Sequence, residues 1–386
     1  MQTDDVCEFL DWCRTQKIEF DGLELIYVQG AGYGLIAKRN FQSEEPVIKL
    51  PQKCLITAGQ VVEIPKYKEL VGNLSTLPSP FEMLVLFFAL EEPQTSTYGP
   101  YLKMLPKDFS TPIYEGIEFP ESDLPDSVLS FWRQQRQELK VVSEKVESLR
   151  PKYSISKERL LWAWHIVNTR CIFVENRPNK FIDQTHGDTI AIIPFVDMLN
   201  HSTNAQGLAL LDKRSSTYMV KAQRFILQDS EVFVCYGPHT NARLYIEYGF
   251  KLPDNPYAKV IVNHDLFFEL AEECGISLSE KRRDIIRRAD LPCHLYATDE
   301  GPSWPLRNNA RLLLIQEDKL DNWNDLIYNS PVDEQEEDEA DKTLSQMLSR
   351  LKIRYEKKIE EVSEQAKWMW KEELAVVDLT LKALQI

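Results

Sequence analysis

The chain has 386 residues, of which 43% are hydrophobic and 10% aromatic, so it can bury a large core and divide into two or three domains. Its formal net charge of -15 argues against direct nucleic-acid binding, which requires a basic surface. The longest apolar run, residues 83–90, is too short to span a bilayer, and the acidic residues 1–5 do not resemble a signal peptide. We therefore expect a cytoplasmic or nuclear protein that is not bound to a membrane.

Helical and β-rich segments alternate along the first half of the chain. A helix is expected over residues 6–18, and short strands separated by turn residues are expected at 23–28, 34–37 and 46–50. Apolar residues at three-to-four spacing then predict helices within residues 57–165, joined by proline-rich connectors. The pattern indicates a helical insertion inside a β-rich domain.

β character returns between residues 190 and 250, and the pattern is helical from residue 255 to the end. We expect the β-rich domain to comprise residues 1–56 and 166–252, and a helical domain to comprise residues 253–386. Residues 342–386 carry one apolar face, which predicts a long helix packed on its own domain or, alternatively, an intermolecular coiled coil. The acidic cluster at 333–339 is predicted to be a solvated or disordered loop.

A glycine-rich stretch, Gly30-Ala31-Gly32-Tyr33-Gly34, is the first candidate for a ligand-binding loop. A dinucleotide fingerprint would place a third glycine at Leu35 and a helix directly afterwards, but the following residues are typical of a strand. No Lys-Ser or Lys-Thr pair follows, which excludes a P-loop. Glycines between two strands are also ordinary hairpin residues, so this motif leaves both interpretations open.

The polar triplet Asn200-His201-Ser202 ends an apolar segment abruptly. It fits an N-glycosylation pattern, which has no use without a secretory signal, and it also fits an ordinary turn. Asp197 lies three residues before the triplet, and Tyr236 and Tyr248 follow in aromatic-glycine contexts. Motifs of zinc proteases and of serine hydrolases are absent. Only these accompanying residues give the triplet a functional interpretation.

The motifs together, in their order, resemble those of SET-domain methyltransferases. They are Gly30-Ala31-Gly32-Tyr33-Gly34-Leu35, Asn168-Thr169-Arg170, Asp197-Met198-Leu199-Asn200-His201-Ser202, Cys235-Tyr236-Gly237 and Tyr248-Gly249-Phe250. The helical insertion and the helical C-terminal part are similar to the subgroup typified by the plant Rubisco large-subunit methyltransferase. The resemblance implies an α+β SET fold: small antiparallel sheets with a helical insertion, a knot-like crossing, and an all-helical C-terminal substrate-binding domain.

The resemblance also implies a cofactor, S-adenosylmethionine, and the residues that bind it. Tyr236 matches the catalytic tyrosine of the family and would also face the cofactor, and Tyr248 matches a second aromatic in the lysine channel. Without the resemblance, both tyrosines are ordinary core or strand residues. The remaining residues that the resemblance assigns to cofactor binding are Gly32, Tyr33, Gly34, Arg170, Asp197, Asn200 and His201.

The activity implied is methyl transfer to a lysine of a histone or non-histone protein, gripped by the C-terminal helices. No zinc is expected, because the cysteine cluster that follows the β-rich domain in many histone methyltransferases is absent. Two alternatives stay open. One is histidine methylation, since a relative in the subgroup modifies histidine in actin, although that relative lacks a tyrosine at the position of Tyr248. The other is a SET scaffold that binds partners without catalysis.

Overall fold

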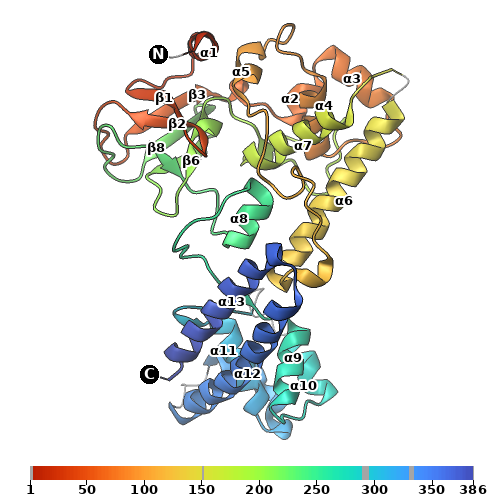
Figure 1. Cartoon of the computed structure of the whole chain (residues 1–386), viewed down its shortest axis with the longest axis vertical. Coiled ribbons are helices and arrows are strands. Elements are labelled where there is room, and N and C mark those ends of the chain that lie inside the picture. The colour runs from red at the N-terminus through yellow and green to blue at the C-terminus, as the bar shows by residue number, and fades with distance from the viewer. Residues whose placement is uncertain (1–2, 150–151, 289–294, 330–333, 386) are drawn as a thin grey trace. The chain divides into compact units, whose positions relative to one another are not determined.

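The computed structural model describes residues 3–149, 152–288, 295–329 and 334–385 (Figure 1). The chain divides into two compact units. The first comprises Met1–Ile117, Gln134–Pro238 and Tyr245–Phe250, and the second comprises Glu118–Arg133, His239–Leu244 and Lys251–Ile386. The division passes through two helices, α6 (Asp126–Leu149) and α8 (Asn241–Tyr248). The three-part domain division expected from the sequence stays a prediction.

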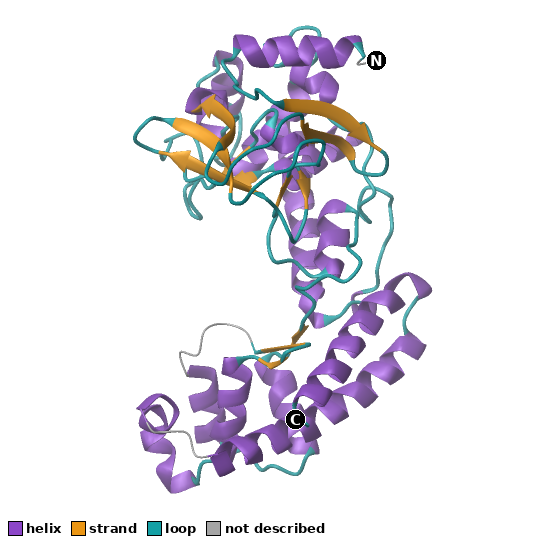
Figure 2. Cartoon of the chain, turned by 90° about the vertical axis from the view of Figure 1, so that its left-hand side faces the viewer, coloured by secondary structure: helices purple, strands orange, loops and turns teal. Residues whose placement is uncertain are grey.

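Small sheets form the centre of the first unit (Figure 2). Strands β1 (Leu23–Val28) and β2 (Gly32–Ala37) form an antiparallel hairpin, as the sequence predicts. A five-stranded sheet has the order β3-β8-β7-β9-β6, and β4 pairs antiparallel with β5. The bounds of these strands are β3 (Pro46–Pro51), β4 (Ile172–Phe173), β5 (Ile190–Ala191), β6 (Asn200–His201), β7 (Gly207–Asp212), β8 (Thr217–Ala222) and β9 (Phe233–Val234).

The helices of the first unit pack their apolar faces into one continuous core with the sheets. Nine of the eleven residues of α4 (Pro80–Leu90) are buried, and Ser79 and Glu82 close its first turn as a capping box. Buried α4 packs against α7 (Lys157–Arg170), which ends at the candidate site. The other helices that lie wholly within this unit are α1 (Asp4–Thr15), α2 (Ala58–Val62), α3 (Pro65–Gly72) and α5 (Gly99–Met104).

The second unit is mainly helical, as expected for the C-terminal part of the chain. Its two longest helices that lie wholly within it, α12 (Glu334–Glu361) and α13 (Glu364–Ala383), pack against each other. It also contains a small antiparallel sheet of β10 (Val260–Ile261), β11 (Tyr296–Thr298) and β12 (Gly301–Pro302). The remaining α-helices that lie wholly in this unit are α9 (His264–Glu273), α10 (Glu280–Arg288) and α11 (Trp304–Leu314). Strands of two or three residues are too short to produce a periodic sequence signal.

Two expectations about the C-terminal part are wrong. The expected single helix over residues 342–386 is two helices. Helix α12 ends at Glu361, and α13 begins directly after its N-cap residue Ser363. Buried Val362 and Ala366 continue the apolar spacing across the break and conceal it in the sequence. The expected acidic loop is helical from residue 334, where Glu336 and Glu337 lie within 4 Å of Arg311 on α11.

The α+β fold of small sheets with C-terminal helices is the one that the sequence predicts. Among the described residues, no helix is both long enough and apolar enough to cross a membrane.

Candidate active site

A buried ion pair connects the end of α7 to the segment that precedes β6. Arg170, the last residue of α7, donates from Nη1 to Asp197 O at 2.8 Å and to Asp197 Oδ2 at 3.0 Å. The hydroxyl of Tyr101 on α5 donates to the same Oδ2 at 2.6 Å. The Asp197 side chain is only 1% exposed, and burial raises the pKa of its carboxyl against the opposing effects of Arg170 and Tyr101. The pair therefore fixes the backbone leading into Asn200.

Asn200 and the glycine-rich hairpin meet through Glu231. The Asn200 side chain donates from Nδ2 to Glu231 Oε1 at 2.7 Å. A Cβ at Gly34 would lie 2.6 Å from that carboxylate oxygen and 2.9 Å from Asn200 Nδ2, so only glycine fits without displacing the pair. The Asn200–Glu231 pair therefore packs directly against the backbone of Gly34, whose predicted part in cofactor binding stays a prediction.

Gly32 and Tyr33 occupy the start of β2. Gly32 has φ +85°, which L side chains rarely adopt, and a Cβ there would meet nothing within 4 Å. The ring of Tyr33 packs edge-on against Tyr27, with their centroids 5.7 Å apart. In the described part of the chain, no hydrogen bond or ring contact joins Tyr33 to the other predicted site residues. The open backbone at Gly32 leaves room for a ligand beside the hairpin.

His201 and Tyr236 are joined because β6 runs parallel to β9, which pairs His201 with Val234. The backbone N–H of Tyr236 donates to His201 Nδ1 at 3.0 Å. Burial lowers the pKa of the imidazole, so the ring is neutral at pH 7 and carries its proton on Nε2. His201 Nε2 is buried and has no hydrogen-bond partner among the described residues. A buried donor without an acceptor is costly, so a ligand atom is expected there.

Four rings gather at the end of β6 and α8. The centroid of Tyr236 lies 5.1 Å from that of His201 and 5.2 Å from that of Tyr248. Phe250 lies 6.0 Å from both His201 and Tyr248. We call these four residues the aromatic cluster. Their spacing is that of packed aromatic rings, and their faces can surround a cationic or apolar group.

A hydrogen bond fixes the orientation of the Tyr236 hydroxyl group. This hydroxyl donates to Leu199 O at 2.8 Å, so the lone pairs of the oxygen remain available as acceptors. Burial raises the pKa of Tyr236 to about 12. The hydroxyl therefore keeps its proton at neutral pH and can accept a hydrogen bond from another group.

Two residues of the site carried no distinctive sequence signal. Tyr101 lies 96 positions before its partner Asp197, inside the insertion, and Glu231 lies 31 positions after Asn200. Neither has a local motif, and only the tertiary fold brings them to the site. Phe250 stands within a motif of the sequence, but its place in the cluster was not predicted. Among the described residues, no three His, Cys, Asp or Glu side chains are placed to hold a metal ion.

A protein-family model for the SET domain matches residues 32–237, more than half of the chain. The chain belongs to the SET-domain family. The matched region begins at Gly32 and ends directly after Tyr236, and so contains all of the predicted site residues except Tyr248.

The relatives of this SET domain include enzymes with two different target residues. SET domain-containing protein 4 of Homo sapiens is 29% identical over 346 residues, covering 86% of this chain and 77% of its own length. A ribosomal lysine N-methyltransferase of Schizosaccharomyces pombe is 28% identical and covers 64% of this chain and 60% of its own length. The actin-histidine N-methyltransferase of Xenopus tropicalis is 24% identical, and the match covers 81% of this chain and 54% of that protein's length.

Solved structures of Rubisco LSMT share the fold. A structure of that protein bound to AdoMet has a TM-score of 0.62 and 14% sequence identity, and the alignment covers 100% of this chain and 89% of the other. Rubisco LSMT has also been solved with sinefungin and monomethyllysine, with the same TM-score. The similarity confirms the SET fold, with its insertion and its C-terminal helices. The roles of the individual site residues stay predictions.

Proposed function

We propose that this SET-domain protein is an S-adenosylmethionine-dependent methyltransferase that modifies lysine side chains of proteins. The observation that carries the proposal is the aromatic cluster of His201, Tyr236, Tyr248 and Phe250, which includes the buried residue of strand β6 and lies next to Asn200. Such a cluster combines an apolar enclosure for a target side chain with an adjacent set of polar groups for a cofactor.

The residues fit the proposed cofactor. His201 Nε2 and Arg170 Nε are buried nitrogen atoms without partners among the described residues, and the backbone at Gly32 is unobstructed. These groups, with Asn200 and the backbone of the hairpin, would hold S-adenosylmethionine. When bound, the cofactor supplies an electrophilic methyl group on a sulfonium cation. Arg170 and Asp197 would act by fixing the backbone at residues 197–200.

A lysine substrate must lose its proton before it can accept a methyl group. With a pKa of about 10.4, deprotonation at pH 7 costs roughly 4 to 5 kcal/mol in water. Enclosure by Tyr236, Tyr248 and Phe250 removes water from the ammonium, which lowers its pKa. The tyrosine faces also attract the cation as it enters. Burial in the aromatic cluster thus favours the neutral amine without a dedicated base.

Tyr236 would position the reacting groups. Because the pKa of its phenol is raised to about 12, it stays protonated at neutral pH and does not serve as the base. Its oxygen is held by the bond to Leu199 O and can accept weak C–H hydrogen bonds from the transferred methyl group. Alignment of amine, methyl carbon and sulfur lowers the barrier by several kcal/mol, on the order of 7 to 11 at the extreme.

Histidine methylation is the second candidate. The similarity to actin-histidine N-methyltransferases favours it, because their sequences match over most of this chain. An imidazole with a pKa of about 6.5 is largely neutral at pH 7 and needs little help from desolvation. Tyr248 favours lysine, because its ring stands 5.2 Å from Tyr236 and adds an aromatic face suited to a cation.

The proposal includes the partner and the location. The substrate is a protein, histone or non-histone, gripped by the mainly helical C-terminal part, and the protein acts in the cytoplasm or the nucleus. A SET scaffold without turnover is the alternative, and the hydroxyl of Tyr236 argues against it because that group has no evident use in a passive binding module.

Calorimetry with S-adenosylhomocysteine, followed by transfer of tritiated methyl groups to proteins of a cell extract, tests the proposal. We expect the wild-type protein to bind the cofactor product and to label extract proteins. Tyr236→Phe should bind with similar affinity and lose most of the labelling. Binding without any labelling by the wild type would support the scaffold alternative, and absence of binding would overturn the cofactor assignment.

A further inference from the structure

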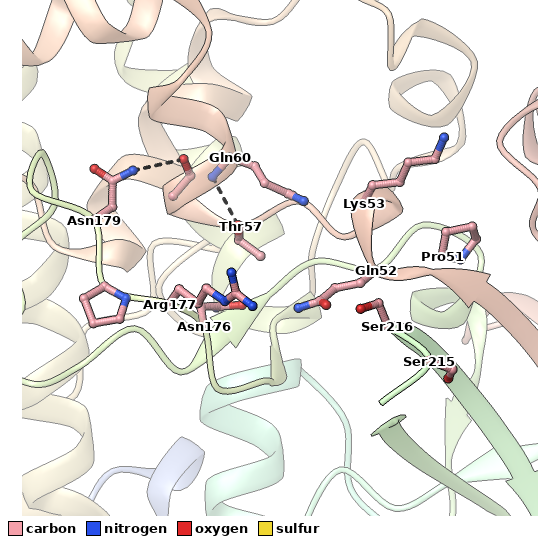
Figure 3. Close-up of a pocket in the computed structure, with 12 residues that line it drawn as sticks. Pro51, Gln52, Lys53, Thr57, Gln60, Asn176, Arg177, Asn179, Ser215 and Ser216 are labelled. Atoms are coloured by element: carbon pink, nitrogen blue, oxygen red, sulfur yellow. Dashed lines mark hydrogen bonds between the residues drawn. The ribbon is translucent and has the colours of Figure 1, made fainter. Parts of the chain in front are cut away.

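A second concave site lies in the first unit and shares no residue with the predicted active site. It is a cavity of about 680 Å³ formed by three segments: the end of β3 with the start of α2, the loop after β4, and the turn between β7 and β8 (Figure 3). Its volume lies in the range of small-molecule sites, which is about 300 to 1,000 Å³. The lining residues are Pro51, Gln52, Lys53, Thr57, Gly59, Gln60, Asn176, Arg177, Pro178, Asn179, Ser215 and Ser216.

The walls of this cavity are fixed by hydrogen bonds within the protein. Asn176 donates from Nδ2 to Asp188 Oδ1 at 2.8 Å and to Ile190 O at 2.9 Å. The Thr57 hydroxyl accepts from the backbone N–H of Gln60 at 3.2 Å, a bond drawn in Figure 3. The loop and the start of α2 are therefore held in place before any ligand arrives.

Asn179 and Ser215 complete the fixed wall. Asn179 donates from Nδ2 to Glu63 Oε1 at 3.1 Å and accepts from the Phe181 N–H at 3.0 Å. Ser215 donates to Asp212 Oδ2 at 2.7 Å. Both side chains form hydrogen bonds with other residues of the protein, so their role is to shape the cavity.

The remaining polar side chains of the lining make no hydrogen bond within the described part of the protein, and all but that of Gln52 are exposed. In the described part of the chain, no hydrogen bond or ion pair involves the side chains of Gln52, Lys53, Gln60, Arg177 or Ser216. Every one of these five carries a hydrogen-bond donor, and two of them are cations. A fixed wall around free donors is the arrangement expected of a binding site for an acceptor-rich ligand.

The charge of the lining stands out against the chain as a whole. The protein has 60 acidic and 45 basic residues, yet the cavity is lined by Lys53 and Arg177 and by no carboxylate. The carboxylates that are hydrogen-bonded to the lining, those of Asp188, Asp212 and Glu63, accept from neutral side chains. In the described part of the chain no ion pair joins Lys53 or Arg177 to an acid, which favours an anionic ligand.

We propose that this cavity binds the phosphate group of a small phosphorylated ligand. Figure 3 shows that Arg177 lies among the neutral donors of the lining, whereas Lys53 points away from them. A guanidinium together with several neutral donors matches the many acceptor oxygens of a phosphate better than the two of a carboxylate. A free phosphate ion would fill only a small part of about 680 Å³, so the rest of the cavity suits a polar body such as a sugar. The amides of Gln52 and Gln60 can donate to and accept from its hydroxyl groups.

Calorimetric titration of the full-length protein tests this site, with S-adenosylhomocysteine present at saturation so that the active site does not contribute. The probes are glucose 6-phosphate, inorganic phosphate and glucose. We expect glucose 6-phosphate to bind and glucose to show no binding. Since a charge-assisted hydrogen bond contributes about 1.5 to 3 kcal/mol, Arg177→Ala should weaken binding by about ten- to a hundredfold.

Two further variants control the experiment. Lys53→Ala removes a lining cation that points away from Arg177 and should weaken binding less than Arg177→Ala does, whereas Arg14→Ala removes an exposed cation elsewhere in the first unit and should have no effect. Binding of inorganic phosphate alone, with the same dependence on Arg177, would support the phosphate site and identify the free ion as its ligand. Failure of both phosphate probes to bind, or binding unaffected by Arg177→Ala, would overturn the proposal.

Discussion

At the scale of single residues, the active-site proposal depends on the direction of a few polar groups. The phenol of Tyr236 points at Leu199 O, and the buried Nε2 of His201 has no partner among the described residues. The first group is suited to positioning a substrate and the second to holding a cofactor. Substitutions that change one group at a time can separate the two functions.

Tyr236→Phe should reduce methyl transfer by roughly a hundredfold or more, because misplacement of reacting groups by about 1 Å has effects of that size. The lost hydrogen bond to Leu199 O should lower the free energy of unfolding by only about 0.5 to 1.5 kcal/mol. Initial rates and urea unfolding measure the two effects. Tyr218→Phe, on β8 and outside the predicted site, is the matched control and should leave the rate unchanged. An unchanged rate in Tyr236→Phe would refute the assigned role.

Gly34→Ala should weaken cofactor binding, because the new methyl group would collide with Glu231 Oε1 and Asn200 Nδ2 and force the hydrogen-bonded pair apart. Both atoms are side-chain ends that can move aside, so the cost is that of the broken hydrogen bond to a carboxylate, about 1.5 to 3 kcal/mol. Calorimetry with S-adenosylhomocysteine measures the affinity. Gly72→Ala adds the same methyl group on α3 where a Cβ meets nothing within 4 Å, and it should bind normally. Equal affinities in the two variants would contradict the role given to the Asn200–Glu231 pair.

At the scale of elements, the sequence predicts the regular segments better than the joints between them. The bounds of β1 match the expected strand because apolar residues of high β propensity fill most of it. The motif order also predicts that His201 and Tyr236 belong to one site, and the two residues are in contact, although their roles stay predictions. The contacts of Tyr101 and Glu231 were missed because they depend on segments that are distant in sequence.

Tyr101→Phe tests whether the insertion supports the site. Its hydroxyl donates to buried Asp197, and hydrogen bonds to charged groups contribute about 1.5 to 3 kcal/mol. We expect a loss of unfolding free energy of that order, accompanied by weaker cofactor binding. Tyr218→Phe again serves as the control for removal of a hydroxyl. A variant that is destabilised and binds the cofactor with wild-type affinity would show that the insertion acts on stability alone.

Helix α13 contains a buried carboxyl group, that of Glu373, which should make the free energy of unfolding depend on pH. Burial raises the pKa of Glu373 from 4.5 to about 7, against hydrogen bonds with Ser127 and Tyr355. The folded state therefore holds this proton more tightly than the unfolded state. Its stabilising contribution, up to about 3 kcal/mol, is complete below pH 4.5 and is lost as the pH rises through about 7.

Glu373→Gln, which is neutral at every pH, should remove this dependence. Its stability relative to the wild type should rise between about pH 4.5 and 8, as measured by urea unfolding at several pH values. Glu361→Gln on α12, a half-exposed side chain, is the control and should follow the wild-type profile. Parallel profiles for Glu373→Gln and the wild type would contradict the assigned proton.

At the scale of the whole molecule, one chain combines a SET domain with a mainly helical C-terminal part, and the same combination is found in Rubisco LSMT. One relative is named a lysine methyltransferase and another an actin-histidine methyltransferase, so fold and family membership leave the target residue open. The aromatic cluster is the feature that favours lysine. The identity of the methylated side chain is therefore the decisive property of the molecule.

Tandem mass spectrometry of extract proteins, methylated by the purified protein with a deuterated methyl donor, measures that property directly. We predict that the label lies on the ε-nitrogen of lysine residues and that it disappears with Tyr236→Phe. A label on histidine residues, or labelled lysine that persists in Tyr236→Phe, would contradict the account.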